Sequence, residues 1–384
     1  MISSPTMQAL PTALRVALLS MALAGPFAAA AEPPGTQQQA GNSQTSHVRL
    51  SAQELSSGRS VRLHAPGATY MKVHLAAFHL PDGVALEVAD PARMDVRRYA
   101  GAALGAHTVD STRGEDGVSS FGVMSVEGDT VDLRLIGSAT TPWQPQDGVM
   151  VHDVETSGDQ IQPAAICGAK DSRPAACYEQ SDPVAYQDSH AVARLMPSGC
   201  TAWRVHVPGG AEDRMLTNYH CMRSQADAAA AEVWFNYESL DCAGAVDARV
   251  VKVPVAQLLK TESDLDYSLF TIQQPEQVAA FGALELQTMA PTVGTEVFIA
   301  GHPNWRRKEL SVVSDQDGGY CRVTGVPGTW VRYSCDTEGG NSGSPVIERA
   351  TGRVLALHNS AGTQCVNQGH SFESIEPRIR ELLR

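Results

Sequence analysis

Three short motifs, far apart in the chain, carry side chains that could together perform nucleophilic chemistry. The most specific is Gly-Gly-Asn-Ser-Gly-Ser-Pro at residues 339–345. A serine hydroxyl becomes a nucleophile when an imidazole accepts its proton, and backbone N–H groups can stabilise the oxyanion that forms. Glycines allow a tight turn that points the N–H groups of Gly340 and Ser342 at one position. The pattern predicts a nucleophile, Ser342, with an oxyanion hole; the alternative is a Gly/Ser loop without function.

The other two motifs could supply a base and its carboxylate partner. His220 follows a strand-like segment and is followed at once by Cys221. Asp266 directly precedes the strand-like segment 267–270. Each motif alone is weak, because a buried histidine beside a disulfide and an aspartate at a strand start are common. Together with Ser342 they predict a catalytic triad, in which the carboxylate fixes the tautomer of the imidazole.

The order of the three motifs favours one arrangement over its rivals. His, then Asp, then Ser is the order of the chymotrypsin-type triad, whereas an α/β-hydrolase uses Ser, Asp, His and a Gly-x-Ser-x-Gly motif. The chain contains no His-Glu-x-x-His, Cys-x-x-Cys or Gly-x-x-x-x-Gly-Lys pattern. We therefore expect no metal and no cofactor. A zinc site built on His220, Cys221 and distant cysteines is the weaker alternative in an exported chain.

Composition limits the class of protein and its partners. The 384 residues are 43% hydrophobic and 18% charged, which is typical of globular chains and leaves room for two domains. A formal net charge of −13 disfavours nucleic acid and anionic membrane surfaces as partners. We expect protein or peptide substrates, no membrane insertion and a monomer.

The N-terminus predicts export. Residues 1–31 combine Arg15, a short apolar run and small alanines, which is typical of a signal peptide cleaved before Glu32. Residues 32–46 are rich in Gln, Gly, Pro, Ser and Thr and predict a flexible linker. A secreted chain, extracellular or periplasmic, favours disulfides among its eight cysteines, for which 105 pairings are possible.

The remaining chain divides into two predicted β units. Residues 47–155 contain strand-like segments between turn signals and predict a small β-sandwich. The turn-rich residues 137–165 predict the border, with Val154 to Gln162 exposed to processing. Residues 165–384 predict an all-β unit with closely spaced short strands. A Ser374 cap, an acidic residue and a proline predict a final helix reaching Leu383.

From about Cys167 onward the chain resembles bacterial trypsin-like peptidases of the chymotrypsin fold, related to lysyl endopeptidases and, around the serine, to glutamyl endopeptidases. The matching segments are Cys200-Thr201, Leu216–Cys221, Trp234–Tyr237 with Cys242, Asp266–Phe270, Gly301–Pro303 and Gly340–Pro345. The resemblance implies two antiparallel β-barrels, with His220 and Asp266 in the first and Ser342 in the second. It also implies a secreted serine endopeptidase, made as a zymogen, that acts through an acyl-enzyme.

The resemblance further implies the disulfide framework. Cys200 would pair with Cys221, Cys177 with Cys242, and Cys167 with Cys365. The two cysteines left over, Cys321 and Cys335, would form an extra bridge.

The resemblance leaves the residue preceding the cleaved bond open between two predictions. Asp336, six residues before Ser342, stands where trypsin-like enzymes keep the acid of the specificity pocket and would select Arg or Lys. Thr337 and His358 match positions that glutamyl endopeptidases use for an acidic side chain. The acid of lysyl endopeptidases is missing from residues 369–371, which read Gly-His-Ser. We favour a basic residue, with glutamyl-type specificity as the alternative.

Two questions remain open at the level of sequence. The N-terminal β unit is either a propeptide, acting as inhibitor or folding aid, or a permanently attached accessory module. A catalytically inactive homologue that acts as a binding protein, or a β unit that binds a surface partner, are the alternatives to an enzyme. An intact triad with both oxyanion donors favours the enzyme.

Overall fold

The computed structural model describes residues 42–102, 104–157, 166, 168–362 and 366–384. The predicted signal peptide lies outside these residues, as do Cys167 and Cys365. The described residues, from Asn42 to Arg384, belong to one compact unit. Among the described residues, no helix is both long enough and apolar enough to cross a membrane.

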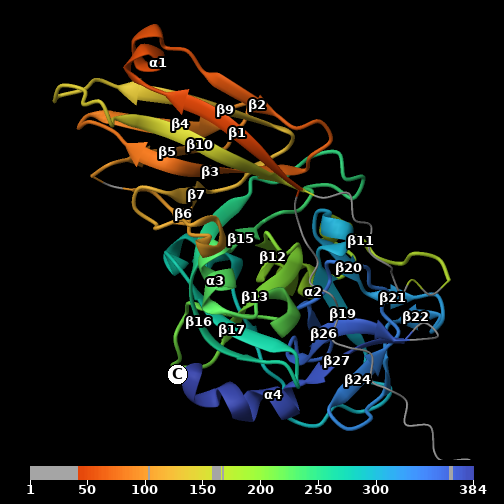
Figure 1. Ribbon diagram of the computed structural model, residues 1–384. Helices are drawn as coiled ribbons and strands as arrows, with labels where there is room; N and C mark the ends of the chain where they lie inside the picture. Colours follow the sequence, from red (N-terminus) through yellow and green to blue (C-terminus); the bar gives the residue numbers. More distant parts are fainter. Residues whose placement is uncertain (1–41, 103, 158–165, 167, 363–365) are drawn as a thin grey trace, which may run out of the picture. The chain divides into compact units, whose positions relative to one another are not determined.

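The N-terminal domain consists of two antiparallel sheets that share one apolar core (Figure 1). Its strands are β1 (Asn42–Leu50), β2 (Val61–His64), β3 (Tyr70–His79), β4 (Val84–Ala89), β5 (Val96–Ala100), β6 (His107–Thr108), β7 (Phe121–Val123), β8 (Val126–Glu127), β9 (Thr130–Gly137) and β10 (Gly148–Thr156). One sheet has the order β1-β10-β3-β7-β6, with β8 also pairing to β3, and the other has the order β2-β9-β4-β5. A short helix, α1 (Ala52–Ser57), follows β1.

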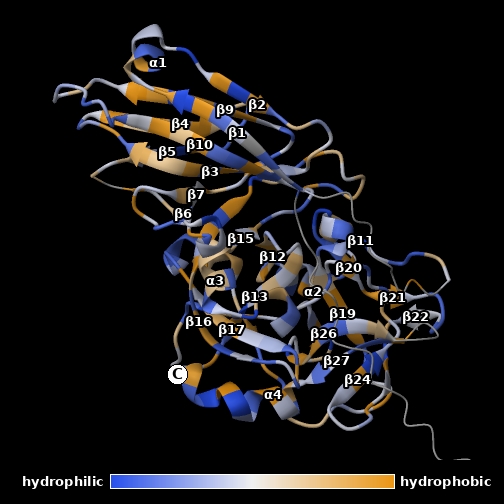
Figure 2. Cartoon of the chain, viewed as in Figure 1, coloured by the Kyte–Doolittle hydropathy of each residue, from blue (hydrophilic) through white to orange (hydrophobic). Residues whose placement is uncertain are grey.

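Burial along the strands explains why these residues form sheets. In β9 the alternate residues Val131, Leu133 and Leu135 are buried while the polar residues between them are partly exposed. Such a period of two is the pattern of a strand with one face on a core. Apolar residues lie along the strands of both sheets (Figure 2). The β-sandwich-like unit expected from the sequence is therefore observed.

Two boundary predictions were wrong, for the same physical reason. The linker predicted up to residue 46 overlaps β1, which begins at Asn42 and pairs with β10. The segment predicted to be exposed from Val154 is buried as far as Thr156, because β10 is paired with β1 on one side and β3 on the other. Backbone pairing of this kind does not require apolar side chains, so composition missed it. Residues 158–162 of that segment lie outside the described residues.

The first barrel of the C-terminal half is closed. Its strands are β12 (Val192–Met196), β13 (Cys200–His206), β14 (Arg214–Thr217), β15 (Glu232–Phe235), β16 (Val251–Glu262) and β17 (Tyr267–Ile272). They follow the order β12-β15-β16-β17-β14-β13, and β13 pairs back to β12. The two-residue strand β18 (Leu284–Glu285) extends β13 in parallel. Closure leaves no free sheet edge and places β14 beside β17, with Thr217 opposite Ser268.

The second barrel is an eight-stranded sheet with the order β11-β20-β19-β25-β26-β27-β24-β23. Its strands are β11 (Arg173–Pro174), β19 (Val297–Gly301), β20 (Glu309–Ser311), β23 (Val323–Gly325), β24 (Trp330–Tyr333), β25 (Pro345–Glu348), β26 (Val354–Gly362) and β27 (Val366–Ser371). A two-stranded ribbon, β21 (Val313–Ser314) with β22 (Gly319–Tyr320), lies between β20 and β23 in sequence. Backbone hydrogen bonds from Val297 to Cys321 and from Val323 to Thr295 bring β23 to the start of β19. The predicted all-β fold with two antiparallel barrels is thus confirmed.

Helices are few and short in the described residues. They are α2 (Pro183–Ser189), α3 (Gln225–Ala230) and α4 (Phe372–Ile379), besides α1. The final helix begins earlier than predicted, since Ser371 and not Ser374 occupies the N-cap position. Phe372, Ile375 and Ile379 explain this start, because their spacing puts all three on the buried face. The helix accommodates Pro377 in its interior.

The cysteines confirm two predictions and contradict a third. Cys177 is bonded to Cys242, and Cys200 to Cys221. The predicted bridge between Cys321 and Cys335 is wrong: both are buried free thiols. Burial, followed by the neighbouring Cys321, raises the pKa of Cys335 well above its ordinary value, so no thiolate is present to start disulfide exchange. The predicted bridge between Cys167 and Cys365 lies outside the described residues.

Removing a disulfide and removing a free cysteine should lower the stability of the protein by different amounts. Replacing Cys177 and Cys242 together by serine opens a loop with a sequence separation of 65 residues, and we expect the free energy of unfolding to fall by about 4 kcal/mol. Replacing Cys321 by alanine removes only a small buried group and should cost about 1 kcal/mol. Urea unfolding of the purified protein measures both. An equal loss in the two variants would contradict the free state of Cys321.

Candidate active site

His220 and the carboxylate of Asp266 are joined by two hydrogen bonds, one from the imidazole and one from the backbone N–H of His220. His220 lies in the 3₁₀ turn Tyr219–Cys221, directly after β14, and Asp266 lies directly before β17. Since β14 and β17 are neighbours, the two residues meet at the same end of the first barrel. Nδ1 of His220 lies 2.7 Å from Oδ2 of Asp266, and the backbone N–H of His220 donates to Oδ1 over 2.9 Å. This geometry leaves Nε2 of His220 as the nitrogen that can accept a proton.

Asp266 has a left-handed backbone conformation, with φ of 44°. That region is costly for most residues but is visited by Asp and Asn more often than by others. Three contacts hold it. The side-chain amide of Asn218 donates to the carbonyl of Asp266 over 2.9 Å, His220 binds both carboxylate oxygens, and the amide of Asn359 donates to Oδ2. Asp266 is therefore fixed from both barrels, because Asn359 belongs to β26.

The loop that carries Ser342 is tied to the first barrel through one residue, Thr201 of β13. The N–H of Thr201 donates to the carbonyl of Ser342 over 2.9 Å, and its hydroxyl donates to the carbonyl of Gly340 over 2.8 Å. The carbonyl of Thr201 accepts from the hydroxyl of Thr217 over 2.8 Å. Thr217 lies three residues before His220, so the same hydrogen-bonded chain reaches both the serine loop and the histidine turn.

The serine loop packs closely against the backbone of neighbouring segments, and this packing requires glycine at positions 340 and 343. Gly340 has φ of 95°, and a Cβ there would lie 2.4 Å from the carbonyl oxygen of His302. Gly343 has φ of 86°, and a Cβ there would lie 2.2 Å from the carbonyl oxygen of Thr201. Among the described residues, neither the N–H of Gly340 nor that of Ser342 donates a hydrogen bond to protein. Two donors without a partner on one loop are the arrangement that an oxyanion requires.

Ser342 and His220 lie on adjoining loops but are not hydrogen-bonded to each other. No contact between Oγ of Ser342 and Nε2 of His220 occurs among the hydrogen bonds of the described residues. Hydrogen bonds to a catalytic nucleophile are often long before substrate binds and shorten in the complex. The absence of this hydrogen bond from the free protein is therefore compatible with proton transfer from Ser342 to His220 in a substrate complex.

A row of polar side chains lies inside the second barrel near the serine loop. The hydroxyl of Thr337 donates to Oδ1 of Asn367 over 2.6 Å, and the amide of Asn367 donates to the carbonyl of Cys335 over 2.6 Å. The hydroxyl of Tyr333 and Nδ1 of His358 are 2.6 Å apart. Burial, and to a smaller extent the nearby His220, lowers the pKa of His358 to about 3. His358 is therefore neutral at physiological pH.

Asp336 is buried, and its carboxylate is partly used by the protein itself. Only 3% of Asp336 is exposed, and its Oδ2 accepts the backbone N–H of Asp171 over 2.9 Å. Asp171 precedes β11, the strand that opens the second barrel's sheet. A carboxylate engaged in this way is less available to a substrate cation than a free one would be.

The one cluster of potential metal ligands at this site does not fit a metal. Cys200, His220 and Cys221 lie within 4.8 Å of one another among the described residues. Both sulfurs are joined in the Cys200–Cys221 disulfide, which removes the thiolates that zinc would need. The group is a disulfide beside a histidine, and the alternative of a zinc site loses its ligands.

Sequence reasoning missed three residues that position the site: Thr201, Asn218 and Asn359. Thr201 and Asn218 lie within the segments that resemble the peptidases, but the sequence predicts no role for either. The residues that they contact are 139 and 48 residues away in the chain. Asn359 directly follows His358. The match of His358 to a specificity-pocket position of glutamyl endopeptidases is the one sequence feature that indicates a site near Asn359. All three act through contacts between segments that are distant in sequence.

Comparisons with known proteins point to a peptidase. The family model described as a trypsin-like peptidase domain matches residues 200–357. The secreted RxLR effector protein 73 of Plasmopara viticola is 29% identical over 325 residues, which cover 77% of this chain and 75% of that protein. Two solved structures each align over 56% of this chain and 98% of their own: the Rv3671c protease in its inactive form, at 14% identity and a TM-score of 0.39, and a Glu endopeptidase in complex with MPD, at 16% identity and a TM-score of 0.40.

The lowered pKa of His358 predicts a loss of stability in acid. In the unfolded chain His358 takes up a proton near pH 6.5, but in the folded protein it does so only near pH 3. The unfolded state therefore binds more protons between these values, and stability falls as the pH falls. We expect the wild type to lose about 2 kcal/mol more than His358→Gln between pH 6.5 and pH 5, measured by urea unfolding. Equal pH slopes in the two proteins would contradict a neutral, buried His358.

Proposed function

We propose that this chain is a serine endopeptidase with His220, Asp266 and Ser342 as its catalytic triad; the match of residues 200–357 to the trypsin-like peptidase domain supports this. The observation that carries the proposal is the pairing of His220 with Asp266 through two hydrogen bonds, next to a serine loop with two unused N–H donors. A structural role would explain either feature alone. Catalysis of acyl transfer requires both in one place.

The proposed mechanism has two halves. Oγ of Ser342 attacks the carbonyl carbon of a peptide bond while Nε2 of His220 takes the hydroxyl proton, and the N–H groups of Gly340 and Ser342 stabilise the oxyanion. The C–N bond then breaks, and His220 gives the proton to the leaving amine. Water attacks the acyl-enzyme in the same way, with His220 as base, and releases Ser342. Asp266 stays ionised and stabilises the imidazolium.

We also propose that the protein is secreted and that residues 1–31 are its signal peptide. The disulfides Cys177–Cys242 and Cys200–Cys221 support this, since such bonds persist mainly in oxidising compartments. The relative from Plasmopara viticola is described as secreted.

The preference before the cleaved bond has two candidates. Cleavage after Arg or Lys rests on Asp336, whose buried carboxylate would pair with the substrate cation. Cleavage after an acidic residue rests on Thr337 and His358. One observation favours this second candidate: Oδ2 of Asp336 already accepts a backbone N–H, whereas His358 is neutral and can donate from one ring nitrogen.

A binding protein without activity is the candidate from another class. Its support is the effector description of the relative from Plasmopara viticola. Under this hypothesis the Asp266 contacts would be structural remnants. Activity measurements separate it from the peptidase, because a binding protein would show no difference between Ser342 and alanine.

Peptide mapping tests the enzyme and its specificity together. The purified mature protein is added to a denatured protein mixture and the released peptides are identified by mass spectrometry. We expect cleavage that Ser342→Ala reduces by at least about 10⁴-fold, while Ser57→Ala, an exposed serine on α1, leaves it unchanged. Released peptides that end in Arg or Lys would support Asp336 as the specificity residue. Peptides that end in Glu would support Thr337 and His358. Equal release by wild type and Ser342→Ala would refute the triad.

A further inference from the structure

The first barrel buries two charged side chains against the N-terminal domain. Glu232 of β15 is fully buried, and its carboxylate oxygens accept the backbone N–H of Ser125 over 3.1 and 3.3 Å. Lys252 of β16 is 2% exposed, donates to the carbonyl of Ser125 over 2.6 Å and pairs with Asp95. Buried charges are stable only with such partners. The N-terminal domain therefore supplies specific groups to the barrel and does not merely cover it.

Further contacts fix the N-terminal domain beside the end of α3. The N–H of Val109 donates to the carbonyl of Ala229 over 2.8 Å, and Nζ of Lys72 donates to the carbonyl of Ala230 over 3.1 Å. The rings of Tyr70 and Trp234 meet edge to face at 6.5 Å. These contacts hold the segment after Val109, which continues into the 3₁₀ turn Ser111–Arg113.

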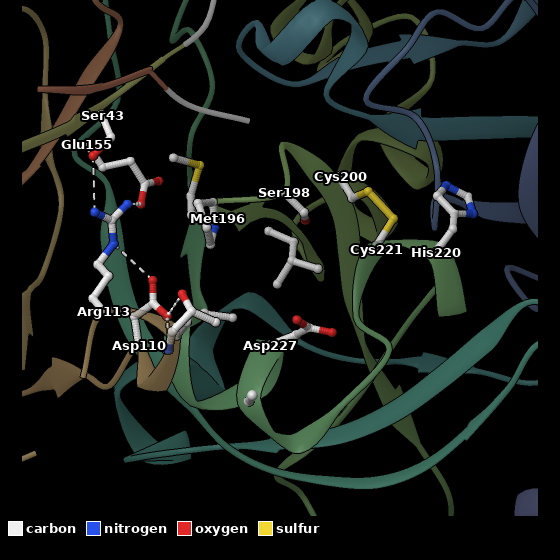
Figure 3. Close-up of a pocket in the computed structure, with 16 residues that line it drawn as sticks. Ser43, Asp110, Arg113, Glu155, Met196, Ser198, Cys200, His220, Cys221 and Asp227 are labelled. Atoms are coloured by element: carbon white, nitrogen blue, oxygen red, sulfur yellow. Dashed lines mark hydrogen bonds and ion pairs between the residues drawn. A yellow bond between two sulfur atoms is a disulfide. The ribbon is translucent and has the colours of Figure 1, made fainter. Parts of the chain in front are cut away.

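That turn forms one wall of a groove of about 570 Å³ that extends from His220 (Figure 3). Asp110, Thr112 and Arg113 line it from the N-terminal domain, and Asp227 lines it from α3. Figure 3 shows the Cys200–Cys221 disulfide between His220 and the rest of the groove. We call this feature the side groove. The histidine is thus connected to a surface that the barrels alone would not form.

The side groove carries more negative than positive charge. Among the described residues that line it, Arg113 is the one permanent cation, and it is already paired with Asp110, Asp153 and Glu155. Burial acts to raise the pKa of Glu155, but hydrogen bonds from His74 and Tyr70 and the charge of Lys72 more than offset this and lower it. Hydrogen bonds from Thr112 likewise lower the pKa of Asp110 against the effect of burial. These carboxylates are therefore charged at neutral pH.

The position of His220 indicates which half of the substrate the side groove faces. In the proposed mechanism His220 gives its proton to the leaving amine, so the leaving peptide lies against the histidine. The oxyanion donors and the polar residues Thr337 and His358 come from the second barrel and would face the acyl half. The side groove is built from the first barrel and the N-terminal domain. It therefore faces the residues that follow the cleaved bond.

We propose that the N-terminal domain is a retained part of the enzyme and that its turn at residues 110–113 forms a binding site for basic side chains on the leaving-group side of the substrate. The proposal rests on the proposed peptidase function and extends it to a substrate class. A Lys or Arg in the side groove is attracted by the net negative charge of the lining, in which Asp110, Glu155 and Asp227 outnumber Arg113, whereas an acidic side chain is repelled.

Charge substitutions at Thr112 test the proposal. Thr112 lines the side groove and is exposed, and Ser57, exposed on α1, lies outside the lining and provides the control. Two sets of peptides share one acyl half, chosen from the mapped products, and carry either Lys or Glu after the cleaved bond. The wild type should favour the Lys set in kcat/KM by about tenfold. Thr112→Lys should reduce this ratio by about fivefold, Thr112→Glu should raise it, and Ser57→Lys should leave it unchanged.

The outcomes separate this proposal from the proposed function. A short anilide with the same acyl half has no residues for the side groove, so its hydrolysis by the wild type reports the peptidase alone. Hydrolysis of the anilide with no Lys preference, or with ratios that ignore the charge at residue 112, overturns the side-groove proposal and leaves the peptidase. No hydrolysis of any substrate overturns both. Opposite shifts in the Lys and Glu variants of Thr112 cannot come from misfolding, and urea midpoints equal to the wild type confirm folding.

Discussion

The double hydrogen bond between His220 and Asp266 is the interaction on which the proposed site depends. It exists only if β14 and β17 are neighbours, because each residue lies at the end or start of one of these strands. It also requires Asp266 to keep a left-handed backbone. That conformation costs on the order of 1 kcal/mol or more and persists because surrounding contacts hold it. Barrel closure and the Asn218 contact are therefore preconditions of the pair and not only of stability.

The second precondition is that the two barrels keep a fixed distance. Thr201 contributes to this through its contacts with Ser342 and Gly340 of the second barrel, while its carbonyl accepts from Thr217 within the first barrel. No larger residue fits at Gly343, since a Cβ there would collide with the carbonyl of Thr201. Asn359 adds a link from the second barrel to Asp266. The residues of the proposed triad thus come from two barrels whose mutual position is set by these polar contacts together with an apolar core that both barrels share.

The sequence predicts the features that depend on short local motifs. The motif at residues 339–345 and the segments around His220 and Asp266 are short, so their residue types alone indicate the triad and the need for glycine. It could not specify pairings over long separations. Residues 42–46, the start of β1, are predicted to be linker because the stability of this strand comes from its pairing with β10, more than 90 residues away in the chain. The pairing of Cys321 with Cys335 rests on elimination alone, and the sequence predicts no role for Asn359. Only the folded chain shows which residues lie near these side chains.

Labelling with a phosphonylating reagent tests the central claim most directly. Such reagents react with a serine only when a neighbouring base and an oxyanion hole activate it. The account predicts a single modified peptide, containing Ser342, in the folded wild type, and none in His220→Ala or in the urea-unfolded protein. An unmodified Ser342 in the folded mature protein, or equal labelling after His220→Ala, would contradict it.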